Sequence, residues 1–139
     1  ILITFIFLRS LDISGNLMTL GGLAIGIGLF ADATVVVVEN IYRHLSEKYN
    51  EDKISIITTS IKEVIKPITF AIGIIMLVFL PIFSLESVEG KYYKPLALTI
   101  ILALLSSLIV AFIFMPVLSY YLIKPGKEET IIFKKLREI

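Results

Sequence analysis

The sequence contains no cysteine and no tryptophan, only one histidine, and few charged residues. The absence of cysteine excludes a disulfide framework, a thiolate metal site and a cysteine nucleophile. Charged residues make up 18% of the 139 residues, whereas apolar residues make up 57%, and the mean hydropathy is +0.93. A soluble domain carries about 25% charged and about 45–50% apolar residues. The excess of apolar residues therefore indicates an integral membrane protein and excludes a disordered chain.

Other classes of function are excluded by features that the sequence lacks. The formal net charge is only +1, whereas nucleic-acid-binding proteins need a strongly basic face. No HExxH, P-loop, GxSxG or dinucleotide-binding pattern occurs, so the sequence predicts neither a cofactor site nor an enzyme. The three methionines, Met18, Met76 and Met115, are scattered along the chain. They do not form the cluster of soft ligands that would indicate a resident Cu(I) or Ag(I) site.

The first residues have the composition of a membrane helix but not its length. They read ILITFIFL, without an initiator methionine, and Arg9 follows them directly. Eight residues are too few to cross a bilayer, which needs about 20. A basic leader and a small-residue cleavage site, which mark a signal peptide, are both missing. We therefore interpret residues 1–8 as the end of a transmembrane helix that begins outside this sequence, followed by a turn over 9–16.

Three longer runs are apolar enough to span a membrane. Residues 17–38 contain a single charged residue, Asp32, and residues 68–85 and 96–123 contain none. Each run is predicted to be a helix, because a segment in lipid must satisfy its backbone hydrogen bonds internally. The last run is long enough to tilt or to bend at Pro116. The predicted fold is therefore all-α, a polytopic transmembrane helix bundle.

The basic residues predict how these helices are oriented. Most of the 13 lysines and arginines lie in the connection over 39–67 and in the tail over 124–139. Only three of them lie in the other two connections, over 9–16 and 86–95. The positive-inside rule therefore predicts that 39–67 and 124–139 are cytoplasmic, and that the other two connections are periplasmic turns.

Two segments outside the predicted spans have apolar residues at helical spacing. The pattern over 54–64 predicts a short cytoplasmic helix ahead of Pro67. Over 131–139, apolar residues alternate with basic ones, which is typical of an amphipathic helix lying on the inner membrane surface. A solvated connector is the alternative for this last segment.

Asp32 is the residue that most clearly indicates a function. It lies in the cytoplasmic half of its span, and an ionised aspartate near a helix centre costs about 2.5–3.5 kcal/mol on insertion scales. Burial favours the protonated carboxyl group and a nearby cation favours the ionised one, so a motion that exchanges these surroundings loads and releases a proton. We therefore predict a proton-relay site at Asp32. A structural aspartate that only pairs helices is the alternative.

The predicted spans contain no lysine, arginine or histidine, so we expect the cationic partner of Asp32 on a helix outside this sequence. Glu39 follows two helical turns later, on nearly the same face, where it could pass protons to the cytoplasm. An interfacial glutamate at a helix end is the alternative for Glu39. Asn40 is expected to help end the helix, and His44 is expected to be a solvated side chain.

Glycines are concentrated in the first half of the same span. Small residues let helices approach closely, and two of these glycines form a small-xxx-small pair. We predict that they pack the helix of Asp32 against a neighbouring helix. The four positions are Gly21, Gly22, Gly26 and Gly28.

Two stretches of the sequence resemble the resistance-nodulation-division (RND) efflux pumps. Residues 16–45 read NLMTLGGLAIGIGLFADATVVVVENIYRHL, and they resemble the fourth transmembrane helix of these pumps, with its Gly-rich entry, aspartate, apolar run and Glu-Asn pair. Residues 79–105 read FLPIFSLESVEGKYYKPLALTIILALL, and they are similar to the fifth helix, periplasmic turn and sixth helix of the heavy-metal branch. The drug-exporting branch tends to have a Gly-rich turn at that place.

This resemblance implies a homotrimeric inner-membrane pump, much longer than this chain, with two six-helix repeats and large periplasmic portions. A periplasmic adaptor and an outer-membrane channel are its implied partners. Asp32 matches the relay aspartate of the fourth helix and Glu39 matches the glutamate of the Glu-Asn pair, while the relay lysine belongs to the tenth helix. Ala33 stands where drug pumps often have a second aspartate, and Gly26 stands where some divalent-metal members have an acid.

The sequence therefore predicts part of the inner-membrane subunit of a proton-driven RND efflux transporter that exports heavy-metal cations by proton antiport. An RND exporter of drugs or amphiphiles is the first alternative. The second alternative is a membrane interaction protein that does not transport and in which Asp32 only pairs helices.

Overall fold

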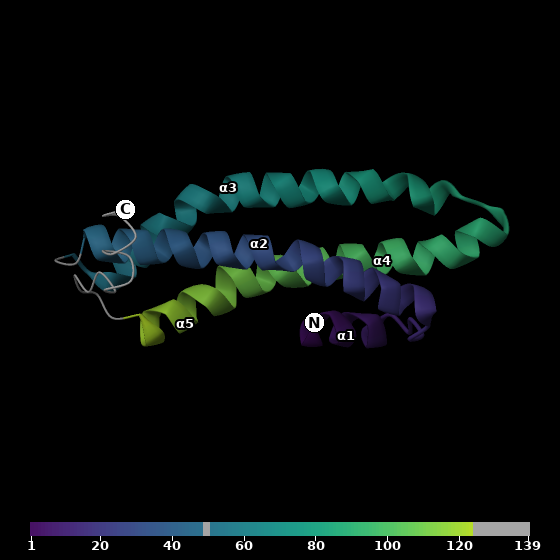
Figure 1. Cartoon of the computed structure of the whole chain (residues 1–139), viewed down its shortest axis with the longest axis horizontal. Helices are drawn as coiled ribbons and strands as arrows, with labels where there is room; N and C mark the ends of the chain where they lie inside the picture. Colours follow the sequence, from purple (N-terminus) through teal and green to yellow (C-terminus); the bar gives the residue numbers. More distant parts are fainter. Residues whose placement is uncertain (49–50, 124–139) are drawn as a thin grey trace, which may run out of the picture.

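The structure is a computed structural model that describes residues 1–48 and 51–123, without the side chains of residues 30–32. Within these residues every regular element is a helix, which confirms the predicted all-α class (Figure 1). The tail predicted over 124–139 lies outside the described residues. The elements in chain order are α1 (Leu2–Ser10), α2 (Leu17–Glu47), α3 (Lys53–Phe79), the 3-10 helix η1 (Leu80–Ser84), α4 (Ser87–Ile109), the π-helix η2 (Val110–Phe114) and α5 (Met115–Leu122).

Three helical segments in the described part of the chain are long and apolar enough to cross a membrane, namely Leu17–Glu47, Lys53–Ser84 and Ser87–Leu122. Each of them is longer than the predicted span that it matches, although the second and third end one residue before the predicted ends at 85 and 123. Most of the turn predicted over 86–95 is helical, because α4 begins at Ser87. Pro95 lies inside α4.

The helix that carries Asp32 begins at a well-formed N-terminal cap. The Asn16 side chain accepts hydrogen bonds from the backbone N–H groups of Met18 and Thr19, each at 2.9 Å. The Thr19 hydroxyl in turn accepts from the Asn16 backbone N–H at 2.8 Å. This reciprocal pair satisfies N–H groups that the first turn of a helix otherwise leaves unpaired. The start of α2 is therefore fixed by residues next to it in the sequence.

Prolines lie inside the long helices without ending them. The short helix predicted ahead of Pro67 and the span predicted after it form one continuous helix, α3. A proline removes one backbone hydrogen bond, but buried Ile56 and Ile72, on either side of Pro67, belong to the same apolar core and hold both halves in place. Near Pro116, the position considered for a bend, the helix contains the π-helix η2, which ends two residues before this proline, and Pro116 lies in the first turn of α5.

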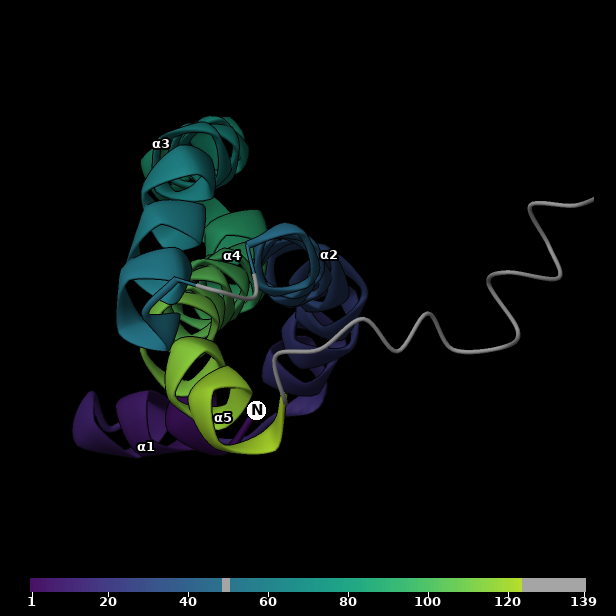
Figure 2. The same cartoon turned by 90° about the vertical axis from the view of Figure 1, so that its left-hand side faces the viewer.

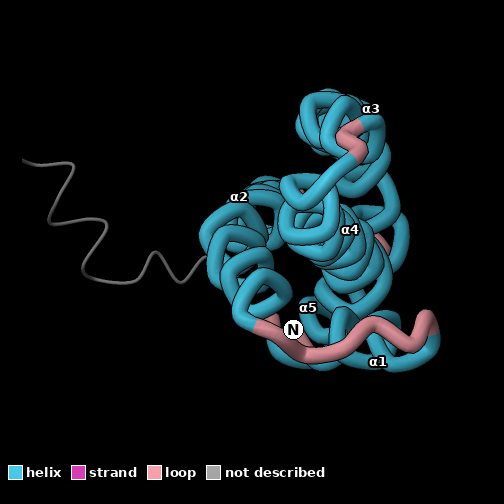
Figure 3. Tube along the Cα trace, turned by 90° about the vertical axis from the view of Figure 1, so that its right-hand side faces the viewer, coloured by secondary structure: helices cyan, strands magenta, loops and turns pink. Residues whose placement is uncertain are grey.

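Helix α4 lies in the middle of the bundle. In the end-on views of Figures 2 and 3, α4 is surrounded by α2, α3 and α1. In Ser87–Leu122, 50% of the most apolar stretch is buried, whereas in Lys53–Ser84 only 6% of the corresponding stretch is buried. The main core joins Val37 and Ile41 of α2, Ile56 of α3, and Ile100 and Leu104 of α4. Helix α3 therefore leaves most of its apolar surface open to lipid or to other parts of the protein.

Helices α2 and α4 approach each other closely at Gly22. A Cβ atom added to Gly22 would lie 2.8 Å from the backbone oxygen of Leu96 and 3.0 Å from Cβ of Thr99. Real Cβ atoms essentially never come within 3.0 Å of another heavy atom, so only glycine allows this contact. Helices α2 and α4 run in the same direction in Figure 1, and this contact sets their relative height.

A valine at position 22 is expected to destabilise the protein, because its side chain would push α2 away from α4. Overpacking of this kind costs about 1–3 kcal/mol. The measurement is thermal unfolding of the complete purified protein, with Gly22→Val compared with Ala24→Val. Position 24 is the matched control, because it is exposed on the same helix and belongs neither to the stripe that packs on α4 nor to the face of Asp32. An equal loss of stability in both variants would contradict the assigned contact.

Candidate functional site

Asp32 lies in the middle of α2, where the backbone is helical on both sides. Its side chain is outside the described part of the structure, so the site is defined by the positions around it. One face of α2 is packed within the chain and includes buried Gly22, Gly26, Ala33 and Val37. Position 32 does not belong to this stripe.

Position 32 belongs to a second face of α2, which the described residues leave open. Residues spaced alternately by four and three lie on one face of a helix. The described residues with this spacing from Asp32 are exposed or half-buried. Ile25 is 47% exposed and Val35 is 59% exposed. The full series is Gly21, Ile25, Gly28, Asp32, Val35 and Glu39.

The four predicted packing glycines divide between these two faces. Gly22 contacts α4 and Gly26 is buried. Around Gly21 and Gly28, in contrast, the described structure has no atom within 4 Å of an added Cβ position. The first pair thus packs inside this chain, and the second pair lies on the open face beside Asp32.

Two buried hydroxyl groups lie at the depth of Asp32. Asp32 is ten residues, or about 15 Å of helix, beyond Gly22. Helix α4 runs parallel to α2, and its residue Leu96 contacts Gly22. The residue ten positions after Leu96, at the same rise along the helix, is Ser106. Ser106 and Ser107 are only 2% and 5% exposed. The hydroxyl group of Ser106 donates to the backbone oxygen of Leu102 on its own helix at 2.7 Å.

Glu39 does not join a polar cluster within the described residues. It is exposed on the open face, two turns beyond Asp32, and makes no hydrogen bond there. The next residue, Asn40, has a different environment, because it is 8% exposed and faces α3.

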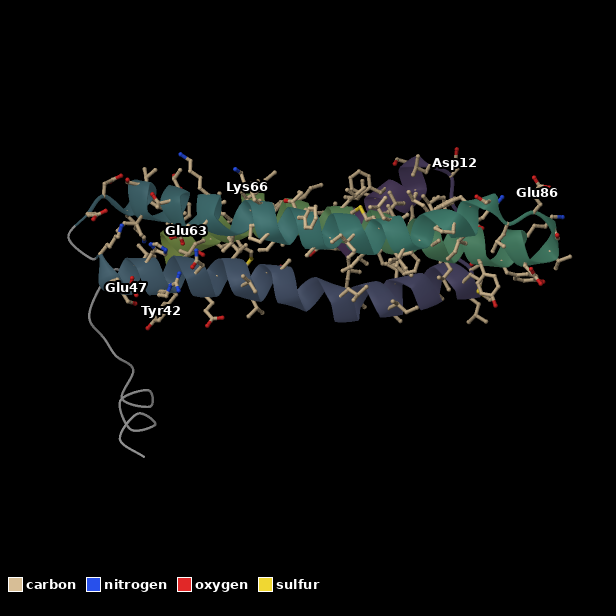
Figure 4. The ribbon with its side chains drawn as sticks, turned by 90° about the horizontal axis from the view of Figure 1, so that it is seen from above. Asp12, Tyr42, Glu47, Glu63, Lys66 and Glu86 are labelled. Carbon is tan, nitrogen blue, oxygen red and sulfur yellow. The ribbon has the colours of Figure 1, made fainter. Side chains whose placement is uncertain are left out.

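A hydrogen-bonded cluster joins α2 to α3 near the end of α2. Nδ2 of Asn40 donates to the backbone oxygen of Ser60 at 2.8 Å and to Oε2 of Glu63 at 3.2 Å. Oδ1 of Asn40 accepts from Arg43 at 2.7 Å, and Nε2 of His44 lies 2.8 Å from Oε2 of Glu63. Figure 4 shows Glu63 on the side of α3 that faces α2.

This cluster corrects two sequence predictions. His44, expected to be solvated, is only 7% exposed, and its Nδ1 is buried without a partner among the described residues. Asn40, expected to help end the helix, lies inside α2, which continues to Glu47. Both polar residues are compatible with a buried helix face because α3 supplies acceptors for them. Glu63 was not singled out from the sequence, and only its place among apolar residues at helical spacing could have indicated it.

A second contact ties the start of α3 to the end of α5. Nζ of Lys53 donates to the backbone oxygens of Tyr120 and Ile123 and lies 5.0 Å from the centre of the Tyr120 ring. Carbonyl groups at the end of a helix lack partners within that helix, and a cation there also interacts favourably with the helix dipole. The ends of α2, α3 and α5 are therefore joined at the same end of the bundle.

No group of three or more histidine, aspartate or glutamate side chains within the described residues could hold a metal ion. The hydrogen-bonded polar groups described above join helices to one another.

Comparison with known proteins identifies the bundle. The sequence profile of the AcrB/AcrD/AcrF family matches residues 1–138. The chain belongs to this family. The RND resemblance of residues 16–45 and 79–105 is thereby confirmed, and this membership argues against a membrane protein that serves only for interaction.

Individual relatives connect this RND chain to heavy metals. Protein HelA of Legionella pneumophila is 42% identical over 113 residues, which are 76% of this chain and 11% of HelA. The cobalt-zinc-cadmium resistance protein CzcA of Cupriavidus metallidurans is 39% identical over 128 residues, which are 83% of this chain and 11% of CzcA. The cation efflux system protein CusA of Escherichia coli K12 is 34% identical over 131 residues, which are 88% of this chain and 12% of CusA. The chain thus spans only about one ninth of these relatives.

Replacing Asn40 by alanine is expected to destabilise the RND protein by about 1–3 kcal/mol, because buried polar groups on α2 and α3 lose a partner. Thermal unfolding of the complete purified protein measures the change. Glu47→Ala is the control on the same helix, since Glu47 is exposed and makes no side-chain hydrogen bond in the described structure. If Asn40→Ala unfolded at the temperature of the Glu47 control, the cluster would not be holding α2 to α3.

Proposed function

We propose that this chain is part of a proton-driven RND pump that exports heavy-metal cations, and that Asp32 is its proton-relay carboxyl group. The observation that carries the proposal is the position of Asp32, on the face of α2 that this chain leaves open. Relatives whose names describe cobalt, zinc and cadmium resistance and cation efflux support the substrate class. Because the chain spans only about one ninth of the length of these relatives, the proposed activity belongs to the complete protein.

The open face explains how an acid in a membrane helix is tolerated. An unpaired charge in an apolar environment is expensive, so an ionised Asp32 needs a cation nearby. The spans of this chain contain none, and the face of Asp32 is free to receive another helix. Gly21 and Gly28 precede Asp32 on this face, and nothing described lies within 4 Å of a Cβ atom added to either, so a second helix can approach α2 closely there.

Protonation of Asp32 would then change the packing of α2. A neutral carboxyl group no longer attracts its cationic partner, so α2 and the partner helix can shift relative to each other. Helix α2 cannot move alone, because Gly22 packs it against α4 and Asn40 joins it to α3. The motion would therefore pass to both neighbouring helices and from them to the parts of the pump that handle the substrate.

The available energy is sufficient for such a cycle. One charge that crosses a potential of 100 mV releases about 2.3 kcal/mol. A pH difference of one unit adds about 1.4 kcal/mol for each proton. Together these terms support uphill export of a cation at a stoichiometry of one or a few protons.

The placement of the pump in the cell follows from the same proposal. The end of the bundle that carries Lys53, Asn40 and Glu63 is cytoplasmic, as the distribution of basic residues predicts. The complete protein is an inner-membrane homotrimer that works with a periplasmic adaptor and an outer-membrane channel. These assignments rest on family membership and on charge distribution.

The complete pump with Asp32→Asn is expected to lose at least 90% of its substrate-triggered proton flux, because asparagine cannot take up a proton. The measurement uses liposomes with a pH-sensitive dye inside, and Cu(I), Ag(I), Zn(II), Co(II) or a cationic dye as substrate. Asp12→Asn is the matched control and is expected to stay within twofold of the wild type. Asp12 is exposed and has a φ of 51°, a conformation that asparagine also adopts readily.

The two parts of the proposal fail in different ways in this assay. Undiminished flux in Asp32→Asn would make Asp32 structural and overturn the relay. Flux with the cationic dye alone would overturn the metal assignment and leave an RND exporter of amphiphiles.

Replacing Glu39 by glutamine is expected to slow proton flux severalfold without abolishing it. Glu39 is exposed on the face of Asp32, so it could pass protons, but water can reach the same end of the helix. The same liposome assay measures the rate, and the exposed Glu47→Gln on α2 is the control. A rate equal to that of the control would assign Glu39 to the membrane interface alone.

A further inference from the structure

A groove runs along the outer surface of α3, away from the site of Asp32. Its walls come from α3 alone, and most of its lining is apolar. At one end it has a lysine and a threonine, and towards the middle it has a glycine that leaves the groove open. The residues that define it are Ile65, Lys66, Thr69, Phe70, Gly73 and Leu77.

The polar end of this groove is not used by the chain. Lys66 and Thr69 are exposed, and within the described residues neither Nζ of Lys66 nor Oγ1 of Thr69 has a hydrogen-bond or ion-pair partner. Figure 4 shows Lys66 on the side of α3 opposite Glu63, so it points away from the cluster that joins α3 to α2. A free cation and a free hydroxyl group, one helical turn apart, form a site for an anionic oxygen.

The rest of the groove has the dimensions and chemistry of a lipid contact. Lys66 directly precedes the uncharged run over 68–85, so it lies at the level where headgroups meet the hydrocarbon core. From Lys66 to Leu77, α3 rises about 16 Å. This distance matches one leaflet, because the hydrocarbon core is about 30 Å thick. Phe70 and Leu77, 72% and 61% exposed, border the apolar part.

We propose that this groove binds an anionic glycerophospholipid, with its phosphate at Lys66 and Thr69 and one acyl chain along Phe70, Gly73 and Leu77. The missing side chain at Gly73 leaves space beside the helix axis for the acyl chain, since nothing lies within 4 Å of an added Cβ atom. A cation at the headgroup level followed by an apolar groove of one leaflet's length fits this molecule better than a protein helix. The proposal goes beyond transport and does not depend on the role of Asp32.

The test is native mass spectrometry of the complete pump with dioleoylphosphatidylglycerol or dioleoylphosphatidylcholine added at equal concentrations. We expect the wild type to retain the anionic lipid preferentially. Lys66→Ala should weaken its binding about fivefold, the effect of one lysine near an anionic surface. Gly73→Leu should weaken both lipids, because leucine fills the groove without displacing any described atom.

Two matched variants control for charge and bulk elsewhere. Lys48→Ala removes an exposed lysine at the end of α2, and Ala71→Leu adds the same side chain to an exposed position of α3 outside the groove. Both should bind lipid like the wild type. Equal binding by all four variants, or equal retention of the two lipids by the wild type, would overturn the proposal.

A photoreactive benzoylphenylalanine at position 74, which also lines the groove, identifies the occupant directly. After irradiation of the pump in native membranes, an adduct with the mass of an anionic phospholipid is expected. A crosslink to a peptide of the pump itself would show that protein covers the groove, and it would overturn the proposal even if the pump transports normally.

Discussion

The close approach of α2 and α4 at Gly22 is the contact on which the rest of the arrangement depends. A methyl group at this position would lie 2.8 Å from a backbone oxygen of α4, so the two helices can adopt their present separation only because position 22 has no side chain. This contact sets the relative height of two parallel helices. The height in turn puts the buried hydroxyl groups of Ser106 and Ser107 level with Asp32. A glycine ten residues away thus sets which level of α4 lies beside position 32.

The opposite end of the bundle is held by polar contacts. There α2 is joined to α3 through Asn40 and Glu63, and α3 is joined to α5 through Lys53. Hydrogen bonds are directional, so they resist sliding of these helices in addition to the interdigitated apolar side chains of the core. A change of force on α2 at Asp32 is therefore expected to move the joined helices as a unit.

The sequence was sufficient for features that depend on neighbouring residues. Long uncharged runs predicted the membrane helices, and Asp32 stood out because it interrupts one of them. Features that depend on distant partners could not be predicted. His44 is followed by charged residues and looked solvated, but its partner Glu63 lies 19 positions away on another helix. Pro67 resembled a boundary, yet core contacts on both sides of it maintain one continuous helix.

The described residues leave two surfaces open, and each of them requires a different kind of partner. On α2, the open face contains an acid that follows two glycines in an otherwise apolar span, so a partner must bring a cation deep into the hydrocarbon layer. Only another protein segment can hold a cation there. On α3, the open groove has its charge at the boundary of the uncharged run, where a phosphate of a lipid is within reach of Lys66. The depth of each charge in the membrane thus determines its partner. Asp32 requires a cation held by protein, whereas Lys66 can bind the phosphate of a lipid.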